Sequence, residues 1–248
     1  MNMNYDKEFF EDLAITAEKS AKIFVPIVHE KLKPRSVLDV GCGTGSWLKA
    51  WSKFNVDIFG IDGDWVSSNI LDIPESNFRH VNLEDGFDLH RKFDLVVSLE
   101  VAEHIHQKSA KRFIKSLVKH GDVILFSAAI PWQGGTNHFN EQWPDYWIKL
   151  FAEKGYLFLD PFRHIVWNMG GIKHHYRQNI ILFVKESLIK GNPFFEKEIP
   201  FAERSLVSVV HPEKYIKTQD PQYRSLRQEL PVFLTLVSNF LRNLIRFR

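Results

Sequence analysis

Short apolar runs alternate with amphipathic segments over most of the chain. Runs of Val, Ile, Leu and Phe that end at glycine, aspartate or a charged residue are typical of buried strands. Such runs predict strands at 36–41, 56–62, 78–83, 92–100, 122–130, 156–164 and 179–185. Segments whose apolar residues recur with the helical period predict helices at 6–32, 45–54, 109–120 and 141–155.

The order of these elements favours one α/β architecture. Strands that alternate with helices predict a doubly wound, Rossmann-like and mostly parallel sheet, here with seven strands. The last two strands, at 156–164 and 179–185, have no obvious helix between them. Because parallel neighbours are usually joined by a crossover helix, the last strand is expected to run antiparallel beside its neighbour.

The periodic pattern fades after residue 186. The sequence therefore predicts a main domain at 1–186 and a helical C-terminal extension at 187–248. Apolar residues near 226–247 fall on one stripe of an amphipathic helix, and arginines lie near its end. Docking on the domain, or on a second copy in a homodimer, is the commoner use of such a helix. Peripheral contact with a membrane surface stays open as the alternative.

Composition and charge narrow the class of function. The chain has 248 residues, 44% hydrophobic and 25% charged, which is an ordinary globular composition. Its net charge of +2 and the lack of a basic stripe do not favour a nucleic-acid partner. A single cysteine, Cys42, indicates a reducing compartment. Because the N-terminal residues are too charged for a signal peptide, we expect a cytoplasmic protein.

A glycine-rich stretch follows the first predicted strand. In "VLDVGCGTGSW" the strand leads into Gly41, Gly43 and Gly45, and a helix begins near Ser46. Glycines let the backbone turn tightly beside a ligand, and a helix N-terminus presents free N–H groups. Asp62 ends the next strand, where a carboxylate can accept hydrogen bonds from both hydroxyls of a ribose. These features predict a nucleoside-binding site at the carboxyl edge of the sheet.

Together with "GIDGDW" and "FDLVVSLEVAEH", this stretch resembles the class I S-adenosylmethionine-dependent methyltransferases. The resemblance implies S-adenosylmethionine as the cofactor, with Asp62 on its ribose and with Asn82 and Leu83 beside its adenine. Many relatives have aspartate where Asn82 stands, and an amide can still hydrogen-bond to adenine. The residues implied to line the methionine end are Asp39, Gly41, Gly43 and Gly45, with Cys42 among them.

A second candidate site lies in "SLEVAEHIH" at 98–106. Glu100, Glu103 and His104 fall on one side of a helical turn after the fourth strand. The loop after the fifth strand, "PWQGGTNHFNEQW", borders the same edge and brings His138. Two carboxylates and two imidazoles that converge would suit a divalent cation, which would also relieve the repulsion between the carboxylates. The metal-free alternative makes His138 a general base and leaves the turn an orienting role.

A narrower resemblance supports the metal. The E-x-x-E-H turn and the later "NHFNEQW" are similar to the metal-binding set of small-RNA 2′-O-methyltransferases, and ubiquinone-pathway O-methyltransferases carry a similar turn. The resemblance implies Mn²⁺ or Mg²⁺ as a second cofactor and a catalytic role for His104 and His138. Its second segment departs from the family, with "FNEQW" in place of a direct F-E-W. The implied ligands are Glu100, Glu103, His104 and His138.

The methyl acceptor is expected to be a saccharide. Aromatic side chains beside Asn, Gln and His in 128–147 and 167–179 suit a ring with apolar faces and a hydroxyl rim. The arrangement resembles methyltransferases of bacterial surface-polysaccharide pathways, which implies a sugar or glycan-pathway acceptor.

Several alternatives to this function stay open. One alternative acceptor carries a phosphate or a phenol, and the stretch 174–177 is either a phosphate contact or a solvated loop. From other classes, the chain is a catalytically silent nucleoside-binding module or a dehydrogenase. Ser46 and the antiparallel last strand weaken the dehydrogenase.

Overall fold

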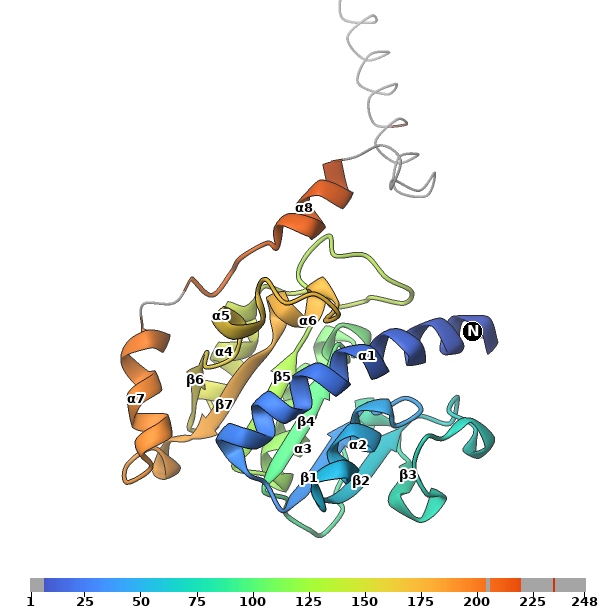
Figure 1. The fold of residues 1–248 in the computed structure, drawn as a ribbon, viewed down its shortest axis with the longest axis horizontal. Helices are drawn as coiled ribbons and strands as arrows, with labels where there is room; N and C mark the ends of the chain where they lie inside the picture. The colour runs from blue at the N-terminus through green and yellow to red at the C-terminus, as the bar shows by residue number, and fades with distance from the viewer. Residues whose placement is uncertain (1–6, 204–205, 220–233, 235–248) are drawn as a thin grey trace, which may run out of the picture. The chain divides into compact units, whose positions relative to one another are not determined.

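The computed structural model describes residues 7–203, 206–219 and Leu234, with side chains at 16–203, 206–217 and Leu234. Its centre is a seven-stranded sheet in the order β3-β2-β1-β4-β5-β7-β6 (Figure 1). The strands are β1 Ser36–Val40, β2 Asp57–Asp62, β3 Phe78–His80, β4 Leu95–Leu99, β5 Val123–Ser127, β6 Tyr156–Leu159 and β7 Ile181–Lys185.

Strand direction follows the sequence prediction. Strands β1 to β5 pair in parallel, and β7 lies between β5 and β6, antiparallel to both. The predicted doubly wound, mostly parallel sheet with an antiparallel last strand is therefore confirmed.

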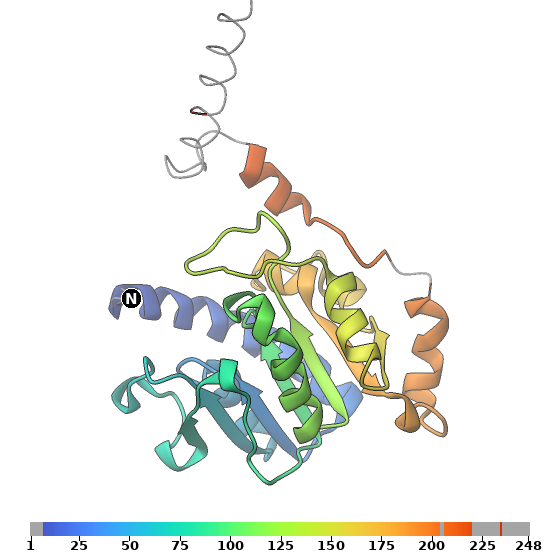
Figure 2. The same ribbon diagram turned by 180° about the vertical axis from the view of Figure 1, so that it is seen from behind.

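Helices cover both faces of the sheet. The helices are α1 Lys7–Leu32, α2 Ser46–Trp51, α3 Gln107–His120, α4 Pro144–Ala152, α5 Arg163–Val166, α6 His174–Asn179, α7 Pro193–Ala202 and α8 Pro212–Gln219. Helices α1 and α2 lie on one face, and α3 and α4 on the other (Figures 1 and 2). Pro144 is in the first turn of α4, where its missing N–H costs nothing.

Alternate residues of each central strand enter two separate cores. In β4, Leu95 and Val97 pack with the aromatic side chains of α1 and α2, whereas Val96 packs with those of α3 and α4. These three side chains of β4 are fully buried. Burial on both faces explains why these strands read as continuous apolar runs.

The segment between β6 and β7 differs from the expectation. The sequence showed no helix there, but the short helices α5 and α6 occupy it, with four and six residues. Helices of one or two turns are too short to display a hydrophobic period, so the pattern did not reveal them. The stretch 174–177 belongs to α6, and the buried Tyr176 and Arg177 exclude the solvated loop.

The chain continues beyond β7 as part of the same unit. Phe195 of α7 is buried in the core shared with α1 and α2. The buried Arg163 binds Asp160 and donates to the carbonyl oxygens of Leu206 and Val207. The contacts divide the chain into one unit ending at Val209 and a second beginning at Val210, whereas the sequence predicted a division at 186/187.

The predicted amphipathic helix near 226–247 lies outside the described residues, apart from Leu234. Its proposed roles in a homodimer or on a membrane surface therefore stay predictions. Among the described residues, no helix is both long and apolar enough to cross a bilayer.

Candidate active site

The carboxyl ends of the parallel strands gather the candidate residues at one edge of the sheet. The loop after β1 meets the end of β2, because the N–H groups of Gly41 and Cys42 both donate to the carbonyl oxygen of Ile61. The chain leaving β4 meets β5 through the Glu100 N–H, which donates to the Ser127 carbonyl. In doubly wound folds this edge is where ligands bind.

The backbone conformation of the glycine loop, and its close approach to a neighbouring turn, both favour glycine. Gly41, Gly43 and Gly45 all have positive φ, which favours glycine. A Cβ on Gly41 would lie 2.4 Å from Cγ2 of Val101, which belongs to the turn after β4. Glycine at this position therefore allows the glycine loop to contact the turn after β4, which carries the second candidate site.

Two buried carboxylates lie beside this loop. Asp62 accepts hydrogen bonds from the N–H groups of Gly43 and Gly63, both at 2.7 Å. Burial nevertheless raises its pKa to about 6. Burial, and then the charge of Asp62, raises the pKa of Asp39 to about 8. One oxygen of Asp39 is buried without a hydrogen-bond partner, so the pair suits a ligand that brings positive charge and hydroxyl groups.

The other predicted cofactor residues, Cys42, Asn82 and Leu83, differ in their exposure to solvent. Cys42 is buried, and burial raises the pKa of its thiol well above the usual value. Asn82 is exposed and caps the 3₁₀ turn Leu83–Asp85 by accepting from the Glu84 N–H. The Leu83 side chain is buried in the core with α3, so only its backbone remains for a ligand.

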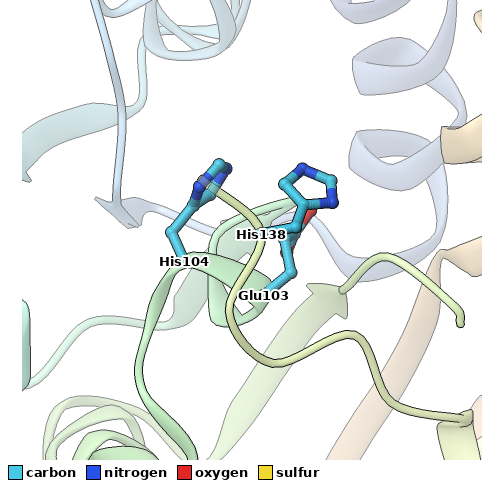
Figure 3. A group of neighbouring side chains, drawn as sticks. All are labelled: Glu103, His104 and His138. Carbon is cyan, nitrogen blue, oxygen red and sulfur yellow. The ribbon is translucent and has the colours of Figure 1, made fainter. Parts of the chain in front are cut away.

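Three of the four predicted metal ligands converge. One ligand atom each from Glu103, His104 and His138 lies within 4.8 Å of the other two. The imidazole rings meet edge to face, with centroids 4.9 Å apart. Figure 3 shows the three side chains together, His138 from the loop after β5 and the other two from the turn after β4. Among the described residues, this is the one group of ligating side chains so placed.

Backbone contacts fix the loop against the turn. The N–H groups of Phe139 and Asn140 both donate to the Glu103 carbonyl, at 2.9 and 3.0 Å. Nδ1 of His104 lies 3.2 Å from the Asn137 carbonyl oxygen. Because these bonds connect the two segments on either side of His138, they hold its side chain near the turn.

Without a bound cation, burial favours the neutral forms of the Glu103 carboxyl and the His104 imidazole. Burial, and then the charge of Glu100, raises the pKa of Glu103 well above its usual value, and Oε2 of Glu103 has no hydrogen-bond partner. Burial and then His138 lower the pKa of His104 to about 4. A neutral imidazole and an unpartnered carboxylate oxygen fit a divalent cation, which would stabilise the charged carboxylate.

Glu100 lies outside this group. Its carboxylate accepts from Nε2 of Gln133 at 2.6 Å and from Nδ2 of Asn179 at 3.1 Å. The Asn179 amide also donates to Oε1 of Gln133 at 2.9 Å. Glu100 therefore connects the turn after β4 to the loop after β5 and to the end of α6.

Sequence reasoning missed Gln133, Asn179 and, most importantly, Glu141. Oε1 of Glu141 lies 2.8 Å from Nδ1 of His138. The same carboxylate accepts from the N–H groups of Trp132 and Gly134. The spacing H-x-x-E was visible in the sequence, but in a loop this spacing does not imply contact as it does in a helix.

Comparison with known proteins shows which family this chain belongs to. A family described as "Methyltransferase domain" matches residues 14–170, more than half of the chain. The chain belongs to this methyltransferase family. The matched residues include the glycine loop, Asp62, the turn after β4 and His138. With the sheet order and the related structures below, this confirms the predicted class I S-adenosylmethionine-dependent methyltransferase.

Two curated relatives of the same name match part of this chain. The chain is 28% identical over 108 residues to a ubiquinone biosynthesis O-methyltransferase of Coxiella burnetii, covering 39% of this chain and 44% of the relative. It is 32% identical over 104 residues to the Bordetella avium enzyme of the same name, covering 39% and 43%. The matches thus span less than half of these relatives.

Solved structures share the fold. Magnesium protoporphyrin IX methyltransferase from Synechocystis PCC 6803, with bound S-adenosylhomocysteine, is 17% identical with a TM-score of 0.54. The match covers 75% of this chain and 90% of that one. The plantazolicin methyltransferase, also with S-adenosylhomocysteine, is 16% identical with a TM-score of 0.51, covering 73% and 91%.

Proposed function

We propose that this methyltransferase transfers the methyl group of S-adenosylmethionine to an oxygen atom of a saccharide acceptor, assisted by Mn²⁺ or Mg²⁺. The convergence of Glu103, His104 and His138 beside the cofactor loop is the observation that carries the proposal. The names of the curated relatives, which are O-methyltransferases, support oxygen as the accepting atom.

The cofactor is held by the loop after β1 and by the two buried acids. Asp62 meets the ribose hydroxyls, and Asp39 faces the positively charged methionine end. The buried oxygen of Asp39 that lacks a partner supports this assignment, because a cationic ligand would supply one. Asn82 and Leu83 flank the adenine, the first by its side-chain amide and the second by its backbone.

Methyl transfer breaks the sulfur–carbon bond, leaves the electron pair on sulfur and forms a carbon–oxygen bond. The acceptor must also lose its hydroxyl proton, because a neutral alcohol is a poor nucleophile. With the cation bound that proton passes to solvent, whereas in the metal-free alternative His138 is placed to take it. Glu103, His104 and His138 would hold the cation, which when bound lowers the pKa of the acceptor hydroxyl. The turn after β4 and the loop after β5 orient the acceptor oxygen toward the methyl group.

The loop that carries His138 has the composition of a saccharide contact. Trp132, six residues before His138, is 86% exposed, and Phe139, directly after it, is 56% exposed with one face stacked on His106. Aromatic faces of this kind stack on the apolar faces of sugars. Trp147, by contrast, is fully buried in the core, whereas Trp143, expected from its helical spacing to share that burial, is 40% exposed. These exposed rings favour a saccharide over an acceptor recognised mainly by charge.

A turnover assay with a chelator tests this proposal. The purified chain is incubated with S-adenosylmethionine and a panel of free sugars, nucleotide-linked sugars and simple phenols, and S-adenosylhomocysteine is measured. We expect turnover with a saccharide, loss of turnover after treatment with EDTA, and recovery when Mn²⁺ or Mg²⁺ is restored. Turnover that survives chelation contradicts the metal, and turnover with phenols alone contradicts the saccharide.

A matched pair of variants locates the chemistry. His104→Asn removes an imidazole from the group, whereas His164→Asn changes an exposed histidine of α5. We expect the first variant to lose turnover while it still binds S-adenosylhomocysteine, and the second to behave as the unaltered chain. Equal turnover in both variants would remove His104 from the mechanism.

A further inference from the structure

One carboxylate organises the loop that carries His138. The N–H of Trp132 donates to Oε2 of Glu141 at 2.7 Å, and the N–H of Gly134 donates to Oε1 at 2.8 Å. Trp132 has a φ of 65°, a conformation that non-glycine residues adopt rarely. The two bonds to Glu141 therefore hold a turn that the local backbone does not favour.

The same carboxylate determines which nitrogen of His138 carries the proton. Oε1 of Glu141 lies 2.8 Å from Nδ1 of His138. An ionised carboxylate only accepts hydrogen bonds, so this contact requires a proton on Nδ1. In the neutral imidazole, Nε2 then keeps its lone pair.

Gly135 imposes a second constraint on the ring. A Cβ built on Gly135 would lie 2.2 Å from Nε2 of His138 and 2.4 Å from Cε1. The imidazole therefore packs against a backbone position where no side chain fits. Glu141 at Nδ1 and Gly135 packed against the ring together define the orientation of the imidazole.

We propose that Glu141 is a positioning residue for His138. Its carboxylate keeps the proton on Nδ1 and fixes the ring, so that Nε2 is the nitrogen available to accept the acceptor's proton or to bind a cation. This role rests on the proposed function, in which His138 acts on the acceptor oxygen. Hydrogen-bonded partners of this kind orient histidines in many metal and catalytic sites.

The isosteric variant Glu141→Gln tests the proposal. The control is Glu153→Gln, the same change at a solvent-exposed carboxylate that forms an ion pair with Lys111. The protonation of His138 is read from two-bond ¹H–¹⁵N correlation spectra of the full chain, with assignment by a His138→Asn spectrum. This spectrum needs no acceptor. The same proteins are assayed for kcat, for the KM of S-adenosylmethionine and for Mn²⁺ binding by calorimetry.

In the unaltered chain we expect His138 to be protonated on Nδ1. In Glu141→Gln we expect mixed or reversed protonation, a kcat lower by ~10- to 100-fold, and a KM for S-adenosylmethionine within about twofold. Glu153→Gln should match the unaltered chain. A spectrum with the proton on Nε2 in the unaltered chain overturns the proposal, as does a variant whose protonation pattern and kcat are both unchanged.

A second variant guards against a purely structural effect. Gly135→Ala keeps Glu141 and its backbone contacts but displaces the imidazole, so kcat should fall while the melting temperature stays within a few degrees. If Glu141→Gln loses activity with unchanged His138 protonation, Glu141 acts only through loop stability and the positioning role is wrong. If the unaltered chain methylates no acceptor, the proposed function fails, and the spectra still decide the role of Glu141.

Discussion

The two halves of the candidate site are constructed differently. On the cofactor side, the positions follow from regular strands, from glycines with positive φ and from buried acids at strand ends. On the acceptor side, the side chains come from a turn, a long loop and α6; the Glu100 carboxylate connects these segments, and the Glu141 carboxylate holds the loop itself. The cofactor side thus depends mainly on backbone geometry, and the acceptor side on hydrogen bonds between side chains.

This difference predicts separable effects of substitution. Changes on the cofactor side should alter stability and the affinity for S-adenosylhomocysteine. Changes on the acceptor side should alter kcat and leave that affinity nearly untouched. Variants that affect both quantities equally would remove the distinction.

The largest effect is expected for His138→Asn. The variant removes one of the three converging ligands or, in the metal-free alternative, the proton acceptor, so kcat should fall by about a thousandfold. The dissociation constant for S-adenosylhomocysteine, measured by calorimetry, should change less than about threefold, because His138 is on the acceptor side. A large loss of cofactor affinity would show that the two halves are not separable.

Asp39 should make stability depend on pH. Its folded-state pKa is about 8, above the ordinary value of 3.8, so the folded chain retains a proton that the unfolded chain releases between these values. The free energy of unfolding should therefore be greatest near pH 4, fall as the pH rises, and level off above pH 8, with a total change of a few kcal/mol as an order of magnitude.

Urea unfolding of Asp39→Asn at several pH values checks this expectation. The slope with pH should flatten in the variant, and S-adenosylhomocysteine should bind more weakly. Asp64→Asn is the control, because the Asp64 side chain is exposed. An unchanged slope in Asp39→Asn would mean that Asp39 is ionised in the folded protein.

Gly41→Ala should weaken the cofactor side through sterics. The new Cβ would approach Val101 to 2.4 Å at a φ of 80°. We expect a loss of ~2 kcal/mol in unfolding free energy together with weaker S-adenosylhomocysteine binding. The double variant Gly41→Ala, Val101→Ala is the sharper test, since it should recover part of the loss if the clash is the cause.

Glu100→Gln should give the smallest effect, confined to the acceptor side. One carboxylate oxygen becomes an NH₂ group that faces a donor amide of Gln133 or Asn179. Loss of one buried hydrogen bond is worth ~1–2 kcal/mol, so kcat should fall about tenfold. Steady-state kinetics beside Glu153→Gln measure this change, and a wild-type kcat would show that the connection is dispensable.

The sequence predicted where the cofactor-side residues lie in the fold far better than where the acceptor-side residues lie. The glycine spacing, Asp39 and Asp62 are local to two strands, and the same strands' apolar runs predicted the sheet. His138 was also predicted from its loop, because that loop had to border the same edge. Strand periodicity and strand-end rules are therefore sufficient for residues fixed by the backbone.

The other contacts on the acceptor side join residues that are far apart in the sequence, and no local sequence pattern predicts them. Glu100 and Asn179 are 79 positions apart in the chain, and Glu100 adopts a left-handed φ of 56°. The sequence assigned Glu100 to the metal group because i, i+3 and i+4 share a helical face. The turn is instead a 3₁₀ turn over Ala102–His104 that begins after Glu100, so the helical spacing does not apply to it.

The central claim is that Glu103, His104 and His138 bind a divalent cation at the cofactor edge. A crystal of the full chain grown with S-adenosylhomocysteine and Mn²⁺ tests it most directly through anomalous diffraction. We predict one anomalous peak within coordinating distance of both imidazoles and the Glu103 carboxylate, on the side that faces the cofactor sulfur. Clear density for the nucleoside with no such peak, or with these three side chains turned apart, would contradict the account.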